Sequence, residues 1–167
     1  MTEILSLEES EKLLKRSDSH NRLRDLCEIH RQMHFDDWVK VLGSEWSGFD
    51  SIHHAEKFLK FALGTNTQRL MMSRWEWKVY ASLPSRVTIY RGCDRDLNTQ
   101  GICWSLDRGI AANFTSYNRH SARNPVLVTA SVLRSRIVAI KLDRGEREVI
   151  TFSAKAVSTE AVGVFVI

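Results

Sequence analysis

The chain has 167 residues, of which 43% are hydrophobic and 26% charged, and its formal net charge is +4 at pH 7. These values exclude disordered, collagen-like and disulfide-rich miniprotein classes. No apolar run approaches the ~20 residues of a membrane-spanning helix, and the N-terminus lacks the basic and apolar regions of a signal peptide. We therefore expect one cytoplasmic domain, residues 1–167, with no membrane partner.

The first part of the sequence, residues 1–84, has helical periodicity. Ser6 and Glu9 form a capping-box pattern, which predicts a helix that buries Leu7, Leu13 and Leu14. Apolar spacing predicts further helices around residues 23–30 and 55–62, and another over residues 66–81. Pro84 ends this helical part because proline cannot continue a helix.

The second part, residues 85–167, is expected to be a β-rich core. Runs of β-branched and aromatic residues predict strands at 87–90, 126–129, 137–140, 148–152 and 163–167. Another strand ends at residues 104–106, and Asp107 is a suitable N-cap for a short helix that runs to Tyr117. The predicted fold class is α+β, with N-terminal helices packed on the strand-rich core. We expect Trp75, Trp77 and Trp104 to lie in the core.

The distribution of charge along the sequence indicates which kinds of ligand and partner the chain could bind. Residues 101–145 carry seven basic and two acidic side chains, a local bias that suits a phosphate-bearing ligand or an acidic partner surface; the alternative is a solvated face. We do not expect nucleic acid as a direct ligand.

Three irregularly spaced cysteines, Cys27, Cys93 and Cys103, indicate reduced thiols that act as small buried hydrophobes.

The histidines do not indicate a metal site. Cys27, His30 and His34 have helical spacing, which could present three ligands to a metal ion. The sequence offers no second cluster to supply a fourth ligand, and the adjacent His53 and His54 point apart. We expect no metal cofactor.

Three polar elements interrupt the apolar strands of the second part. They are Tyr90-Arg91-Gly92, Ser105, and the segment Glu146-Arg147-Glu148. A buried arginine or carboxylate requires a partner, so their convergence on one cleft would be explained by a ligand. The alternatives are a core ion pair between Arg91 and Glu148 and a solvated turn carboxylate at Glu146.

In this order the elements resemble the R-S-E class of ADP-ribosyltransferases. That family has an aromatic-Arg-Gly strand, a Ser-containing strand followed by a helix with Ala and Phe, and an ExE turn that opens a strand. The matching residues are Tyr90-Arg91-Gly92, Ser105, Ala111, Ala112, Phe114 and Glu146-Arg147-Glu148. The usual Ser-Thr-Ser is here Trp104-Ser105-Leu106, so one hydroxyl remains. The resemblance covers about residues 86–167 and implies a split, NAD-binding β-core.

The chemistry of NAD cleavage suits these residue types. Breaking the nicotinamide–ribose bond develops positive charge on the ribose, which a carboxylate at Glu148 would stabilise. Arg91 would bind the pyrophosphate through its planar guanidinium, and Ser105 would hydrogen-bond Glu148. By resemblance, Phe114 would stack against nicotinamide; its place on an apolar stripe also suits a core residue.

Two further residues complete the expected site. Gly92 would let the backbone approach the nicotinamide amide closely. Glu146 lies two residues before Glu148, and an extended segment would point both side chains to the same side. By resemblance, Glu146 would position or deprotonate the acceptor.

The resemblance implies a mono-ADP-ribosyltransferase, an enzyme of the glycosyltransferase class that moves ADP-ribose from NAD to a protein. Small size suggests a phage or intracellular effector that modifies transcription, translation or defence proteins of its host cell, and the toxin of a toxin–antitoxin pair is equally compatible. The helical part, especially Trp38 and Trp46, would recognise the target. The alternative is a catalytically weak module that binds NAD or ADP-ribose, or one that inhibits a partner by occlusion.

Overall fold

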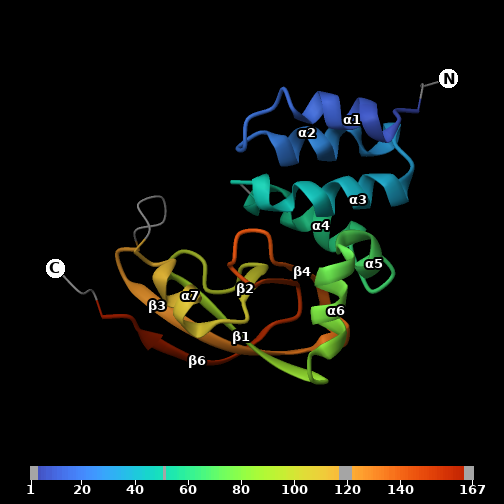
Figure 1. Cartoon of the computed structure of the whole chain (residues 1–167). Coiled ribbons are helices and arrows are strands. Elements are labelled where there is room, and N and C mark those ends of the chain that lie inside the picture. The colour runs from blue at the N-terminus through green and yellow to red at the C-terminus, as the bar shows by residue number, and fades with distance from the viewer. Residues whose placement is uncertain (1–3, 51, 117–121, 164–167) are drawn as a thin grey trace. The chain divides into compact units, whose positions relative to one another are not determined.

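The computed structural model describes residues 4–50, 52–116 and 122–163 and divides into two compact units, Met1–Trp77 and Lys78–Ile167. The expected α+β class is confirmed, since helices precede an antiparallel sheet (Figure 1). None of the helices in the described ranges is long and apolar enough to cross a membrane. Tyr117, where the short helix was expected to end, and residues 164–167 of the expected last strand lie outside these ranges.

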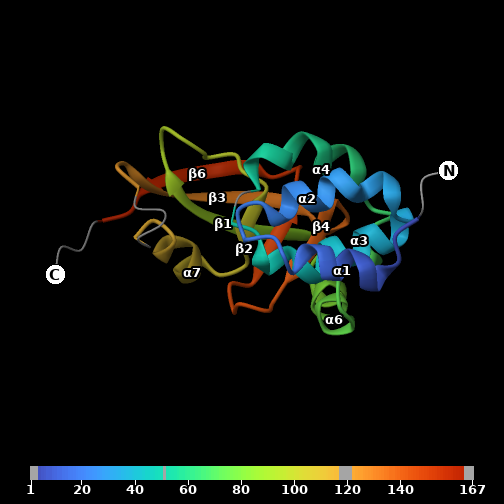
Figure 2. The same cartoon turned by 90° about the horizontal axis from the view of Figure 1, so that it is seen from above.

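The first unit is helical. Its α-helices are α1 (Leu7–Leu14), α2 (Arg22–Glu28), α3 (Phe35–Glu45), α4 (Glu56–Ala62), α5 (Gln68–Met71) and the start of α6 (Arg74–Ser82). Three short 3-10 helices lie between them, at Ile29–Gln32, Trp46–Gly48 and His53–Ala55. Figure 2 shows α1, α2 and α3 from above.

The start of α1 was predicted well, and its buried face was not. Ser6 and Glu9 form the capping box, since each side chain binds the other's backbone amide. Leu14 is buried, but Leu7 and Leu13 are exposed, which corrects the prediction for those two. With eight residues, α1 has a narrow inward stripe, which Leu14 shares with the buried Ser10.

The core of the first unit depends on α3, a helix that the sequence reading did not identify. Trp38 and Trp46 are each 1% exposed, so the expectation that they recognise a target is wrong. The Trp38 indole donates to the Leu26 carbonyl oxygen at 2.9 Å, which satisfies its one polar atom. At Gly43, a Cβ would lie 2.4 Å from the Met71 carbonyl oxygen, so only glycine permits this approach of α3 to α5.

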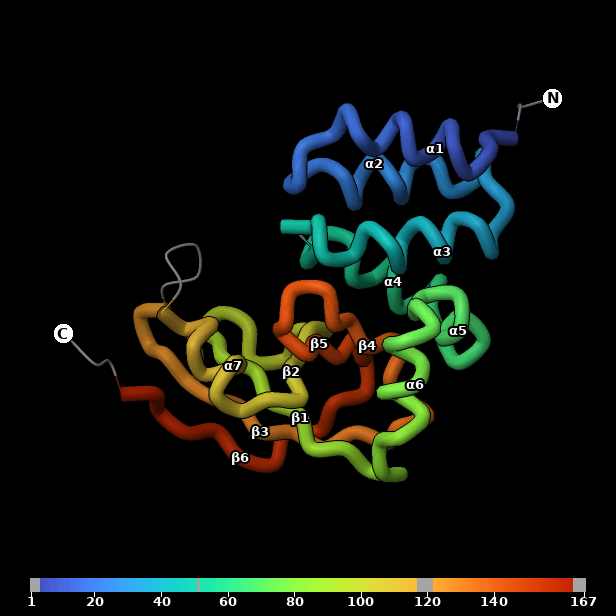
Figure 3. The backbone as a smooth tube through the Cα atoms, viewed as in Figure 1, coloured from blue at the N-terminus to red at the C-terminus, as the bar shows by residue number. Residues whose placement is uncertain are grey.

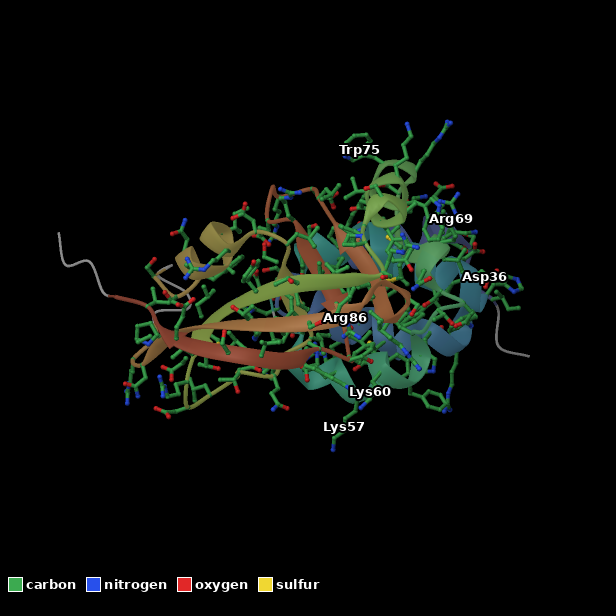
Figure 4. The ribbon with its side chains drawn as sticks, turned by 90° about the horizontal axis from the view of Figure 1, so that it is seen from below. Asp36, Lys57, Lys60, Arg69, Trp75 and Arg86 are labelled. Carbon is green, nitrogen blue, oxygen red and sulfur yellow. The ribbon has the colours of Figure 1, made fainter. Side chains whose placement is uncertain are left out.

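The helix predicted over residues 66–81 is two helices, because Met72 between them is extended. Ser73 and Glu76 then cap the start of α6: the Ser73 amide donates to the Glu76 carboxylate at 2.8 Å. Trp75 is 64% exposed, which corrects its assignment to the core; Figure 4 shows its side chain extending away from α6. Trp77 is half-buried, with the Arg69 guanidinium 4.6 Å from its ring centre.

The second unit contains a six-stranded sheet in the order β4-β5-β2-β1-β3-β6, in which all neighbouring strands are antiparallel. The strands are β1 (Arg86–Asp94), β2 (Cys103–Ser105), β3 (Pro125–Leu133), β4 (Ile137–Lys141), β5 (Glu148–Thr151) and β6 (Lys155–Ala161). One helix, α7 (Arg108–Asn113), follows β2. Trp104 is buried, as predicted.

The division between the units falls inside α6 rather than at Pro84. The last turn of α6 binds the sheet unit: the Tyr80 hydroxyl donates to the Arg134 carbonyl oxygen, and the Arg134 guanidinium donates to the carbonyl oxygens of Ala81 and Leu83. Helical periodicity in the sequence does not record which unit a turn packs against.

Strand β6 was not predicted. Every residue of Lys155–Ala161 is exposed, so the strand has no apolar face that would give an alternating pattern. It is held by backbone pairing to β3, from Ser131–Lys155 to Val126–Ala161. Gly163, the one described residue of the expected last strand, follows β6 and is not in a strand.

Candidate functional site

A row of polar residues crosses the sheet at one register position. The structure pairs Lys141 with Glu148, Glu148 with Ser105, and Ser105 with Tyr90. Beyond Tyr90 the pairing continues through Thr129 to Ser158. Directly opposed residues of antiparallel strands share a face of the sheet. The row therefore consists of Lys141, Glu148, Ser105, Tyr90, Thr129 and Ser158, and we call it the polar row.

The polar row brings together parts of all three sequence elements. Ser105 ends β2 and Glu148 begins β5, and the two residues are direct neighbours although 43 positions separate them in the sequence. Ser105 is buried and Glu148 half-buried. A partly shielded carboxylate interacts more strongly with a nearby charge than one in bulk water does. The part of the polar row around Ser105 and Glu148 is the candidate site.

The Ser105 hydroxyl fixes the turn before Glu148. It donates to the Glu146 carbonyl oxygen at 2.8 Å and accepts from the Asp107 amide at 3.0 Å. The Leu106 amide adds a hydrogen bond to the Arg147 carbonyl oxygen at 2.9 Å. Because a hydroxyl has one proton, Ser105 donates to the backbone that carries Glu148, rather than to its carboxylate as we expected.

The turn before β5 is not extended. Gly145 has φ 69° and Arg147 has φ 48°, the one non-glycine residue with positive φ in the described ranges. A left-handed conformation costs a non-glycine residue roughly 1–2 kcal/mol. The alternation used to place Glu146 beside Glu148 needs an extended chain through Arg147, so that argument fails here. Glu146 itself is half-buried.

The Arg91 side chain projects from the side of β1 opposite to Tyr90 and the polar row, because side chains alternate along a strand. Its Nε donates to the Asn98 carbonyl oxygen at 3.0 Å, and its guanidinium also donates to the Cys103 carbonyl oxygen. A Cβ at Gly101 would lie 2.4 Å from this guanidinium. Arg91 therefore connects β1 to the segment that leads into β2.

Gly92 lies under α7. A Cβ at this position would lie 1.8 Å from the Ala111 carbonyl oxygen, so only glycine lets the helix pack this closely on β1. This contact accounts for the glycine without a ligand. Helix α7 begins at Asp107, whose carboxylate accepts from the Ile110 amide at 2.9 Å, and Phe114 follows as its half-buried C-terminal cap.

Three of the seven basic residues of the segment 101–145 have separate structural roles in the described part of the chain. Arg108 of α7 pairs with Glu160 of β6 at 2.6 Å. Arg134 binds the backbone carbonyl oxygens at the end of α6. Lys141 is 5% exposed and belongs to the polar row. The local charge bias therefore does not by itself indicate a phosphate-binding surface.

The histidine cluster of the sequence is part of the helical packing. The His30 Nδ1 lies 2.5 Å from the Cys27 carbonyl oxygen, and its ring packs 4.9 Å from Phe58. Burial raises the pKa of the Cys27 thiol to about 11, which disfavours the thiolate form that binds metals. Among residues 4–50, 52–116 and 122–163, no group of three His, Cys, Asp or Glu side chains is placed to hold a metal ion.

Pairing register is what sequence reasoning missed at this site. The sequence identified Ser105 and Glu148 but gave no sign that Lys141 lies opposite Glu148, or that Thr129 and Ser158 continue the same row. Register depends on turn geometry as well as on pattern. Comparison of the chain with protein-family models, with curated proteins and with solved structures finds no match.

Proposed function

We propose that the protein is a mono-ADP-ribosyltransferase that transfers ADP-ribose from NAD to a protein. The observation that carries the proposal is the direct pairing of Ser105 with Glu148, together with the hydrogen bond that ties the Glu146 backbone to Ser105. These are the Ser and ExE elements of the family that the sequence resembles, and they are adjacent in space.

Glu148 would act on the ribose of NAD. The leaving of nicotinamide develops positive charge at the ribose carbon, and a fixed carboxylate beside it lowers the barrier. The turn that precedes Glu148 is held in place, because the Ser105 hydroxyl and the Leu106 amide both donate hydrogen bonds to its carbonyl oxygens. A carboxylate on an anchored strand end needs little reorganisation when the charge appears.

Arg91 would contribute mainly by holding the segment between β1 and β2. Its two backbone acceptors, Asn98 and Cys103, lie in that segment and at the start of β2. A guanidinium has five N–H donors, more than these two carbonyl oxygens use, so Arg91 would contact the NAD pyrophosphate where the nucleotide reaches the side of β1 opposite the polar row. Loss of Arg91 would then affect both the fold and NAD affinity.

The acceptor is proposed to be a protein of the cell that contains the enzyme. Glu146, at the turn between β4 and β5, would position or deprotonate the acceptor side chain. Phe114 would offer its ring to nicotinamide. An effector of a phage or an intracellular toxin would use this chemistry to modify host machinery.

The proposal is tested by incubating a cell lysate with the protein and biotin-labelled NAD, followed by mass spectrometry of labelled proteins. Wild type should label a small set of proteins, and Glu148→Gln should label none. Glu160→Gln is the matched control, because Glu160 is an exposed carboxylate at the sheet edge that pairs with Arg108. It should label as wild type does.

Two results would count against the proposal. Equal labelling by wild type and Glu148→Gln would remove Glu148 from the chemistry. Absence of both labelling and nicotinamide release from wild type would remove the enzyme altogether, and calorimetric titration with NAD would then distinguish an NAD-binding module from a protein with no affinity for the nucleotide.

A further inference from the structure

Lys141 is the charged residue that the sheet places next to Glu148. It ends β4 and lies directly opposite Glu148 of β5 in an antiparallel pair. Residues opposed in this way have Cβ atoms about 4.5–5.5 Å apart and share a face of the sheet. Lys141 is also 5% exposed, whereas lysine is rarely buried to this extent.

Burial makes the neighbouring charge matter. An ammonium removed from water is costly unless an opposite charge or hydrogen-bond acceptors compensate it. On the far side of Glu148, the opposed residue is Ser105, which carries no charge. Other charged residues lie two positions after Ser105, at Asp107, and in the turn between β4 and β5, at Asp143, Arg144, Glu146 and Arg147.

We propose that Lys141 is a positioning residue of the candidate site: its ammonium holds the Glu148 carboxylate ionised and oriented across the β4–β5 pair. Opposite charge favours ionisation over a distance of about 4–6 Å. An ionised Glu148 is the form that stabilises a cationic ribose. The catalytic consequence rests on the proposed function, whereas the interaction between the two side chains does not.

The pairing of Lys141 with Glu148 is not evident from the sequence. Six residues separate Lys141 from Glu148, and the intervening segment turns back on itself between β4 and β5 (Figure 3). In the sequence, Lys141 is one of the seven basic residues of the segment 101–145. Its burial and register distinguish it from the exposed members of that group.

The test is a carbon-13 NMR titration of the Glu148 carboxyl carbon, with the signal assigned by its absence in Glu148→Gln. In wild type the midpoint should lie below the ordinary glutamate value of about 4.3. In Lys141→Met, which keeps most of the length of the unbranched side chain and removes its charge, the midpoint should rise by about 1–3 pH units. Lys141→Arg should restore a low midpoint.

The matched control is Lys155→Met, which removes a lysine from the exposed edge strand β6 and should leave the midpoint unchanged. A wild-type midpoint above the ordinary value would overturn the proposal even if Lys141→Met fails to fold. An unchanged midpoint in folded Lys141→Met would overturn it too.

The same variants separate this proposal from the proposed function. If wild type releases nicotinamide from NAD, the acid limb of the pH–rate profile should move to higher pH in Lys141→Met, as the NMR midpoint does. A midpoint that moves in a protein without any NAD-cleaving activity would support the Lys141–Glu148 interaction and reject the transferase.

Discussion

The two sides of strand β1 are held in different ways. On one side β1 pairs with β3 along nine positions, from Arg86–Leu133 to Asp94–Pro125. On the other, the described residues pair β1 with β2 at the single position Tyr90–Ser105. Figure 1 shows β1 and β3 running together over their length. The continuous ladder forms the framework of the sheet, and the one-pair junction is where the polar row and Arg91 lie.

Side chains replace backbone pairing at the β1–β2 junction. Arg91 reaches the carbonyl oxygens of Asn98 and Cys103, and Ser105 binds the turn before β5. A one-pair junction uses fewer backbone groups in strand pairing than the nine-position ladder does. The difference suggests that changes on the β3 side reduce stability, whereas changes on the β2 side reduce activity first.

The largest effect is expected from Glu146→Gln, on the β2 side. If Glu146 deprotonates the acceptor, its loss should slow labelling of target protein by about 10²–10⁴-fold, the usual contribution of a general base. Slow hydrolysis of NAD by water should persist, since it needs no positioned acceptor. Parallel measurement of free nicotinamide and labelled protein checks this, with Glu160→Gln as control. Equal loss of both activities would place Glu146 at NAD instead.

The β3 side should respond to Ile89→Ala. Ile89 is fully buried and pairs with Ala130 in the long ladder, and truncation of such a residue costs about 2–5 kcal/mol of unfolding free energy. Urea unfolding measures the loss. Thr88→Ala, on the exposed face of the same strand, should change stability by less than about 0.5 kcal/mol. Similar losses of unfolding free energy in the two variants would contradict the assignment of the core to the face of β1 that carries Ile89.

The sequence predicted the parts of the fold that have a strong local pattern. The apolar run at residues 137–140 predicted a strand, which the structure forms as Ile137–Lys141, and the N-caps at Ser6 and Asp107 were also predicted. Strand β6 was missed because all of its residues are exposed. Lys141 was missed as a neighbour of Glu148 because pairing register is a tertiary property. That Arg91 lies on the opposite side of the sheet from Ser105 could not be predicted either, because it depends on the pairing of Tyr90 with Ser105.

An intermediate effect is expected from Arg91→Lys at the β1–β2 junction. Lysine keeps the charge but cannot reach both Asn98 and Cys103, and loss of a hydrogen bond from a charged donor costs about 1.5–3 kcal/mol. Thermal unfolding and calorimetric titration with NAD should therefore both report a decrease. The matched control is Arg86→Lys on the same strand, an exposed residue labelled in Figure 4. A fall in stability with unchanged NAD affinity would confine Arg91 to the fold.

The smallest effect is expected at the end of β1, from Asp94→Asn. Hydrogen bonds from the backbone amide of Asp96, and then from those of Asn124 and Arg123, lower the pKa of the Asp94 carboxyl. A lowered folded-state pKa gives stability that is present above the unfolded value of about 3.9 and lost as pH falls through the folded value.

The Asp94→Asn protein should therefore melt slightly below wild type at pH 7, and the difference should shrink as the pH falls below the unfolded value. Thermal unfolding between pH 7 and pH 3 measures it, with Asp36→Asn, an exposed carboxylate of α3, as control. A constant difference across this range would contradict the contribution of the Asp94 charge.

Glu148, held beside Ser105 at the start of β5, is proposed to act on charge that develops as NAD is cleaved. The most direct test measures nicotinamide release and NAD affinity for wild type and Glu148→Gln in the same buffer. We predict a fall in kcat of about 10²–10³-fold with NAD affinity nearly unchanged, because the carboxylate is needed in the transition state. Equal rates for the two proteins, or a loss confined to NAD affinity, would contradict it.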